Sequence, residues 1–443
     1  MAQKLIIGNG TLVTLGENNR ILDKGAVYIE GNIIKDFGPD SKIKVKYKDA
    51  KYHDAQGKTI MPGLICAHHH LYSTFACGIS AEPAANFVEI LNKLWWKLDR
   101  ALKLEDVYYS AMIPLIKCIK AGTTTIIDHH ASPSSIIGSL DKIAEATKLA
   151  GVRANLCYEL TDRGGEKEIS QGIEENISFL ERCKSDGDSM LSGLFGLHAS
   201  MTLSTKTMQR ALDAVCGLDA GFHIHVAEDK ADVADSLSKY KMRVIERLKS
   251  LGILGEKSIA AHCIHINEKE MNILKETGTN AVHNPQSNMN NSVGCADVLK
   301  MLSKGVLVGL GSDGMTSNMY DEMRTALLVQ HHVQQDPRVA FVESIDLLVK
   351  NNIKIASKLV NAKVGTIEKG ALADVIIVDY YPYTPISANN FYGHFMFGIA
   401  SVPVDTTVIN GKFVMKNKKL VNIDETEIYR QAGKLSKKVW DRF

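Results

Sequence analysis

Eight short runs of apolar and β-branched residues, each ending in a polar side chain, constrain this fold more than any other feature of the sequence. Longer amphipathic stretches separate the runs, which is typical of βαβ units and a parallel sheet. The runs end near residues 67–70, 127–130, 157–159, 197–200, 225–228, 261–263, 282–285 and 311–314. Eight β/α units over about this length indicate a (β/α)8 barrel, whose chemistry lies at the C-terminal strand ends.

A doubly wound sheet is the alternative architecture for this pattern. It would scatter the polar strand ends along a crevice instead of gathering them on a ring. The sequence has neither a glycine-rich dinucleotide fingerprint nor a Walker A loop. We therefore expect an α/β protein with a metal-dependent TIM barrel over residues 61–360.

The two ends of the chain have a different sequence pattern, in which short apolar runs alternate with residues typical of turns. Examples are the apolar run 5–7 before residues 8–10, and the segment 407–414, which contains an Asn-Gly hairpin turn. Neither end has enough strands for a core of its own. We expect residues 1–60 and 361–443 to form one small β-sandwich domain, with a terminal helix at the C-terminus.

Composition excludes several classes of function. The 52 basic and 50 acidic residues give a net charge of +2, which argues against a nucleic-acid-binding protein. No apolar run reaches the roughly 18 residues that span a bilayer, and no secretion signal is recognisable. The eight cysteines are scattered without a C-x-x-C pair, as expected for reduced thiols. We expect a cytoplasmic protein with no membrane or nucleic-acid partner.

Histidines at the first and fifth strand ends suggest a metal site. In a strand, His68 and His70 point to one face and His69 to the other, so the first two imidazoles can bind one cation. His225 ends the fifth strand and Asp313 the eighth. Three neutral imidazoles and one carboxylate suit a Zn²⁺-like ion. We therefore predict a single divalent ion held by His68, His70, His225 and Asp313.

The catalytic prediction follows from the charges around that ion. A metal lowers the pKa of bound water and so supplies hydroxide near neutral pH. Glu228, three residues after His225, is placed to give a proton to the leaving group or a neighbouring ring nitrogen. Asp313 and His262 are placed to accept the proton of the water, although His262 could instead be a fourth imidazole ligand.

The ordered strand-end segments resemble those of the amidohydrolase superfamily, in particular its cytosine/guanine deaminase and chlorohydrolase branch. The similarity is carried by segments 61–70, 225–228, 261–263, 283–288, 311–314 and 365–374. Segments 94–102, 128–133 and 287–291 are similar to the SsnA-type aminohydrolases, a group associated with purine catabolism. The resemblance implies one zinc or iron ion on the four predicted ligands, proton transfer by Glu228, His262 and Asp313, and substrate contact by His198.

The resemblance also implies deamination of a purine-like heterocycle. Members with two metals have a lysine at the end of strand four, where this chain has His198, so one metal is expected. Trp95 is either a stacking surface for a flat ring or a core residue, and His129 either lines the pocket or packs beneath it. Hydrolysis of a cyclic amide, displacement of another ring leaving group and a purely structural metal site are the alternatives. Relatives suggest a homo-oligomer, a dimer or larger.

Overall fold

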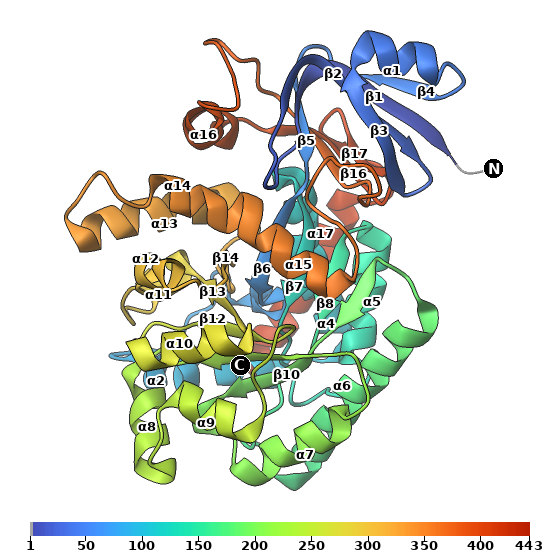
Figure 1. Cartoon of the computed structure of the whole chain (residues 1–443). Helices are drawn as coiled ribbons and strands as arrows, with labels where there is room; N and C mark the ends of the chain where they lie inside the picture. Colours follow the sequence, from blue (N-terminus) through green and yellow to red (C-terminus); the bar gives the residue numbers. More distant parts are fainter. Residues whose placement is uncertain (1–2) are drawn as a thin grey trace.

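The computed structural model describes residues 3–443, and it contains two sheets of parallel strands below a third sheet built from both chain ends (Figure 1). The parallel strands are β6 (Leu64–His69), β7 (Thr123–Asp128), β8 (Arg153–Leu156), β9 (Leu191–Gly193), β10 (Phe195–Ala199), β11 (Phe222–Val226), β12 (Ile259–His262), β13 (Asn280–His283) and β14 (Val308–Leu310). The first four form one sheet in the order β6-β7-β8-β9, and the last five form another in the order β10-β11-β12-β13-β14.

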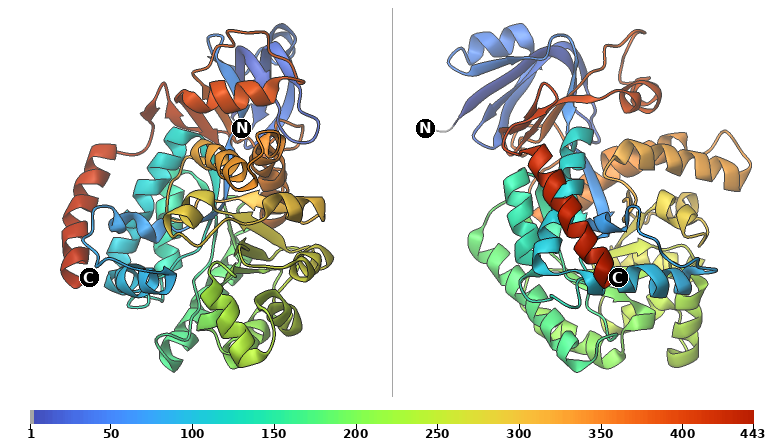
Figure 2. Two further views of the ribbon diagram at one scale, coloured as in Figure 1. Left: turned by 90° about the vertical axis from the view of Figure 1, so that its left-hand side faces the viewer. Right: turned by 180° about the vertical axis from the view of Figure 1, so that it is seen from behind.

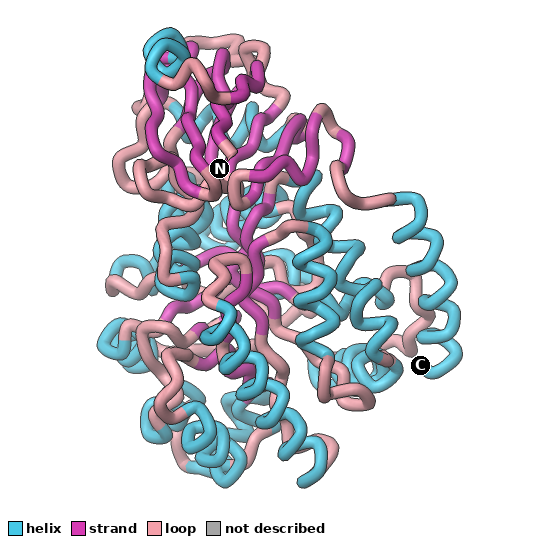
Figure 3. Tube along the Cα trace, turned by 90° about the vertical axis from the view of Figure 1, so that its right-hand side faces the viewer, coloured by secondary structure: helices cyan, strands magenta, loops and turns pink. Residues whose placement is uncertain are grey.

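Two isolated bridges connect the two parallel sheets. One joins His69, the last residue of β6, to Asp313 after β14, and the other joins Leu160 after β8 to Leu197 in β10. Helices surround these strands (Figure 3). The arrangement is a TIM-barrel-like α/β fold, as the strand count predicts. The short strand β9 was not expected from the sequence, because three residues are too few to give a periodic signal.

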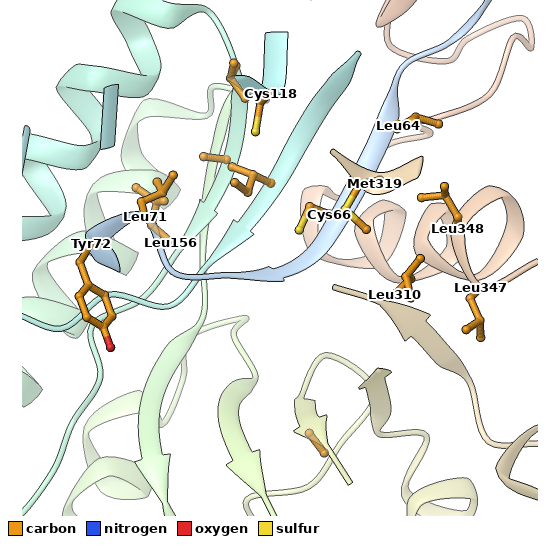
Figure 4. Packing of buried hydrophobic residues seen from close by; sticks show 14 of the residues in the cluster. Leu64, Cys66, Leu71, Tyr72, Cys118, Leu156, Leu310, Met319, Leu347 and Leu348 are labelled. Carbon is orange, nitrogen blue, oxygen red and sulfur yellow. The ribbon is translucent and has the colours of Figure 1, made fainter. Parts of the chain in front are cut away.

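The helices alternate with the parallel strands along the chain. They include α4 (Leu104–Ala121), α5 (Ser139–Ala150), α6 (Glu166–Asp186), α7 (Thr205–Val215), α8 (Lys230–Tyr240), α9 (Val244–Leu251), α10 (Glu268–Thr277), α12 (Val298–Ser303), α13 (Met319–Gln334), α14 (Phe341–Asp346) and α15 (Asn352–Val360). Figure 4 shows how the first and last strands pack on the helical layer, where Leu64, Cys66 and Leu310 lie close to Met319 of α13. All four side chains are buried, so this contact anchors β6, the strand that leads to the histidine cluster.

The third sheet confirms that the two chain ends pair with each other. Its strand order is β18-β17-β16-β15-β5-β1-β2-β3, with β4 beside β1. The N-terminal strands are β1 (Lys4–Val13), β2 (Ile21–Glu30), β3 (Ile33–Pro39), β4 (Lys51–Asp54) and β5 (Thr59–Pro62), and the C-terminal ones are β15 (Val375–Val378), β16 (Val404–Ile409), β17 (Lys412–Lys416) and β18 (Lys419–Leu420). Antiparallel pairing of β5 with β15 joins the two groups.

Two local features of the C-terminal segment agree with the sequence. β16 and β17 form an antiparallel hairpin, and Asn410 and Gly411 both have positive φ, as an Asn-Gly turn requires. The terminal helix α17 (Glu425–Arg442) runs back along α4 (Figure 2). Near its end, the Trp440 indole donates to the carbonyl of Phe75 at 2.8 Å. None of the helices in residues 3–443 is long and apolar enough to cross a membrane.

Candidate metal centre

The imidazoles of His68 and His70 converge, as the alternation of side chains along β6 predicts. Their ring centroids are 4.8 Å apart, and both side chains are buried. His69 turns elsewhere, and its Nδ1 lies 4.0 Å from the Asp128 carboxylate. His68 is held from below by His223, whose Nε2 is 2.8 Å from His68 Nδ1. These contacts leave the Nε2 atoms of His68 and His70 directed at a common centre.

Two backbone carbonyls fix the imidazoles of His70 and His225. His70 Nδ1 donates to the carbonyl of His129 at 2.5 Å, and His225 Nδ1 donates to the carbonyl of His198 at 2.9 Å. In the neutral rings, each Nε2 is therefore a lone-pair acceptor. The two Nε2 atoms face each other 3.1 Å apart. Two neutral acceptors at this distance repel unless a proton or a metal cation lies within reach of both.

The remaining donor atoms of the described residues fall into overlapping groups, none of which contains all four predicted ligands. The donor atoms of His68, His70 and Asp313 lie within 4.8 Å of one another, as do those of His68, His225 and His262. His68 Nε2 is buried without a hydrogen-bond partner among residues 3–443. Asp313 Oδ1 is 3.1 Å from His70 Nε2. A buried nitrogen without a partner and a carboxylate beside it are the groups that a metal ion satisfies.

The electrostatics show how strongly the carboxylate and imidazoles interact. Burial by itself would lower the pKa of His70, but the Asp313 carboxylate raises it to about 9. Burial would raise the pKa of Asp313, but the positive charge of protonated His70 holds it well below its usual range. Ser287 Oγ donates to Asp313 Oδ2 at 2.5 Å, and the amide of Gly314 donates to Oδ1 at 2.8 Å. Asp313 is therefore an ionised carboxylate held in a fixed orientation.

Glu228 and His262 lie close to each other and to Asp313. His262 Nε2 is 3.6 Å from Glu228 Oε2 and 3.7 Å from Asp313 Oδ2, and it has no hydrogen-bond partner in the described chain. Its Nδ1 is 2.8 Å from Asn288 Oδ1, which orients the ring. Burial raises the pKa of Glu228 to about 7. Three groups able to exchange protons therefore border the same space.

The backbone at these strand ends adopts conformations that side-chain-bearing residues seldom take. Ala227, His262, Cys263 and Asp313 all have φ between 47° and 72°. Such strain concentrates at functional sites, where the surrounding structure holds it in place. Gly311 meets a different need, because a Cβ there would lie 2.8 Å from the Cβ of His68. The glycine lets β14 approach β6 and bring Asp313 beside the histidines.

A small cavity opens onto this cluster. Its lining includes the predicted acid–base and ligand side chains His70, His225, Glu228 and Asp313, and the residues Tyr72, Trp95, Trp96, Glu159, His198 and Asn291. Trp95 and His198, both predicted to contact substrate, therefore lie in the wall of the cavity.

His129 is placed beneath the cavity and is not part of its lining. Its Nε2 is 3.1 Å from the carbonyls of Leu197 and His223, and its Nδ1 is 3.2 Å from Glu159 Oε2. Sequence reasoning assigned no role to Glu159. The signal that could have found it is its position three residues after β8, since the other strands are also followed by polar residues.

Comparison with known proteins agrees with this geometry. A model of the amidohydrolase family matches residues 59–414. The chain is 32% identical to a 5′-deoxyadenosine deaminase from Methanobrevibacter smithii over 93% of both proteins. It is 30% identical to a 5-methylthioadenosine/S-adenosylhomocysteine deaminase from Caldanaerobacter subterraneus over 97% of both. A zinc-bound adenosine deaminase from Xanthomonas campestris superposes with a TM-score of 0.85, at 22% identity, over 99% of this chain and 98% of that one.

The chain therefore belongs to the amidohydrolase family, which confirms the resemblance inferred from the strand-end segments. It is a hydrolase of the kind that acts on C–N bonds. Because the solved adenosine deaminase is only 22% identical to this chain, its similarity supports the fold alone.

Proposed function

We propose that this member of the amidohydrolase family is a metal-dependent aminohydrolase that deaminates a purine-like heterocycle and releases ammonia. The observation that carries the proposal is the facing pair of His70 and His225 Nε2 atoms, 3.1 Å apart on the wall of a cavity that also contains Glu228. The names of the relatives, which are deaminases of adenosine-type compounds, support a purine-like ring with an exocyclic amino group.

One divalent ion would be held by His68, His70, His225 and Asp313. Three imidazoles and one carboxylate favour zinc, with iron as the alternative. When bound, such an ion lowers the pKa of water towards neutrality. The tautomers of His70 and His225 support this ligand set, because each ring donates through Nδ1 and keeps Nε2 as an acceptor.

The chain's own residues would move the protons of the reaction. Water adds its oxygen to the carbon that carries the amino group, while one of its protons passes to an Asp313 oxygen or to His262 Nε2 and Glu228 gives its own proton to the adjacent ring nitrogen. The proton held by Asp313 or His262 then passes to the amino group, the C–N bond breaks and ammonia leaves, and the remaining proton of the added water returns to Glu228. Each such carrier contributes about 10²- to 10⁴-fold to the rate. The raised pKa of Glu228, about 7, suits a group that must both hold and release a proton.

Substrate contacts form part of the same proposal. Trp95 and His198 line the cavity, and Trp95 presents an aromatic ring edge-on to Tyr72 with centroids 6.4 Å apart. A flat heterocycle can stack on such surfaces. His129 lies below the lining, so we propose that it acts on the substrate through Glu159, which it contacts.

The proposed architecture places this chemistry in a closed (β/α)8 barrel over residues 61–360. Bridges between the two parallel sheets support closure. Residues 1–60 and 361–443 would form a small β-sandwich, supported by the pairing of β5 with β15. We further propose a cytoplasmic homo-oligomer; all eight cysteines are unpaired, which suits a reducing compartment.

Metal analysis combined with a substrate screen tests this function. Purified protein should contain close to one equivalent of zinc or iron and should release ammonia from at least one aminated purine, pterin or triazine. Removal of a different leaving group, such as chloride, without ammonia would instead support the hydrolase alternative. Metal binding without turnover of any compound would contradict the proposal.

A further inference from the structure

We propose that Glu159 is a specificity-determining residue whose carboxylate accepts hydrogen bonds from a ring N–H of the substrate. This inference rests on the proposed deaminase function and narrows its substrate class. The preferred compounds would be 2-amino-lactam heterocycles, in which an N–H lies next to the carbon that bears the amino group. Adenosine-type rings have a nitrogen lone pair at that position.

The first step of the argument is that Glu159 faces the cavity as an ionised group. The residue follows β8, is only 4% exposed and lines the cavity. Burial by itself would raise the pKa of Glu159, but the neighbouring imidazoles of His198 and His129 hold it well below its usual range. A buried carboxylate accepts hydrogen bonds and cannot donate them. It therefore favours donors on any molecule that fills the cavity.

The second step is that one carboxylate oxygen is engaged and the other is available. His129 Nε2 donates towards the carbonyls of Leu197 and His223, and its Nδ1 lies 3.2 Å from Glu159 Oε2. The other oxygen, Oε1, is 3.7 Å from His198 Nε2, which is too long for a good hydrogen bond. Oε1 therefore has capacity for a donor that comes from the substrate.

The third step locates that donor on the ring. An oxygen of Glu159 and one ring nitrogen each of His70 and His225 lie within 4.8 Å of one another. A group that bonds Glu159 is consequently close to the reacting carbon. A sugar hydroxyl is several bonds away from the aminated carbon, whereas a ring N–H can be its direct neighbour. The position of Glu159 close to the reacting carbon therefore favours a ring N–H over a sugar hydroxyl as its hydrogen-bond donor.

The same distances admit a different role, in which Glu159 helps to hold a cation together with His70, His129 and His225. His129 could offer only Nδ1 to such a cation, because its Nε2 lies 3.1 Å from two backbone carbonyls. Metal content of a Glu159 variant decides between the two.

The test compares two sets of probes with wild-type protein and Glu159→Gln. Guanine, isocytosine and pterin carry an N–H beside the aminated carbon, whereas adenine and 5′-deoxyadenosine do not. The wild type should have the higher kcat/KM for the first set. In Glu159→Gln this preference should fall at least tenfold, because a hydrogen bond to a charged group is worth about that much or more. Zinc content and melting temperature should be unchanged.

Two further variants keep the result interpretable. Glu159→Asp retains the charge on a shorter side chain and should keep part of the preference for probes with an N–H beside the aminated carbon. This variant still tests the inference if Glu159→Gln folds poorly. Glu175→Gln is the matched control, because Glu175 is another buried carboxylate, which binds the amides of Gly138 and Leu140 outside the cavity. It should leave the ratio between the probe sets unchanged.

Several outcomes would overturn the inference. They are a wild-type preference for adenine, an equal loss for all probes in Glu159→Gln, and a loss of zinc in that variant. A change confined to the ratio of 5′-deoxyadenosine to adenine would assign Glu159 to a sugar hydroxyl and would also refute the ring contact. Failure of the wild type to release ammonia from any probe would instead count against the proposed deaminase function.

Discussion

Replacing Glu228 with glutamine should abolish most turnover while leaving the fold and the metal site in place. Glutamine has nearly the same volume, and its amide oxygen can still accept from Asn291 Nδ2, which lies 3.4 Å from Glu228 Oε1. It cannot give up a proton. Loss of one proton carrier costs about 10²- to 10⁴-fold in rate. We therefore expect kcat to fall by that factor, which corresponds to about 3–5 kcal/mol of activation free energy.

The assay measures ammonia release at saturating substrate, together with zinc content and melting temperature. Glu322→Gln is the matched control. That side chain is fully buried but outside the cavity lining, and burial raises its pKa well above the usual range, as burial also raises the pKa of Glu228. The control should retain wild-type kcat. A Glu228→Gln enzyme with full zinc and more than a tenth of wild-type kcat would refute the assigned role.

Three other predictions concern the metal and the scaffold. Dialysis against a chelator should eliminate ammonia release and lower the melting temperature, and added zinc should restore both, because the ion binds the folded state; unchanged activity would contradict a metal-dependent mechanism. Asp374→Asn should reduce the free energy of unfolding in urea by about 3–5 kcal/mol, because it leaves Arg153 buried without the carboxylate that it binds through Nε and Nη2 at 3.0 Å. Asp336→Asn, at a partly exposed carboxylate, serves as the control. Gly311→Ala should destabilise the protein by about 1–3 kcal/mol and weaken zinc binding, because the new Cβ would lie 2.9 Å from the backbone nitrogen of His68. A normal zinc affinity would show that β14 can move away from β6 without disturbing the site.

The sequence predicts that the four proposed metal ligands converge, because each of them lies at a strand end. His68 and His70 are two residues apart in a strand, so their shared face follows from backbone geometry alone. His225 and Asp313 follow from the fold, since all parallel strands of a barrel deliver their C-terminal ends to one rim. The pairing of the chain ends could likewise be predicted, because neither end alone has enough strands.

Other parts of the site could not be predicted, because they depend on contacts across the barrel. The position of His129 below the cavity is set by the carbonyls of Leu197 and His223, which come from two other strands. Glu159 is a single acidic residue in the segment that follows a short strand, and an acidic side chain in such a segment is usually exposed to solvent. Only the folded chain shows that it faces a cavity.

The orientation of the ligands depends on the pairing between neighbouring strands. His70 at the end of β6 donates to the carbonyl after β7, and His225 in β11 donates to a carbonyl in β10. The groups that fix both tautomers are thus backbone atoms, whatever the side chains at positions 129 and 198. The side chains at these two positions are therefore not needed to orient the imidazoles. His198 forms part of the cavity wall, and His129 contacts Glu159. In the proposed site, backbone carbonyls would therefore orient the metal ligands and side chains would contact the substrate, although residues 129 and 198 supply both kinds of group.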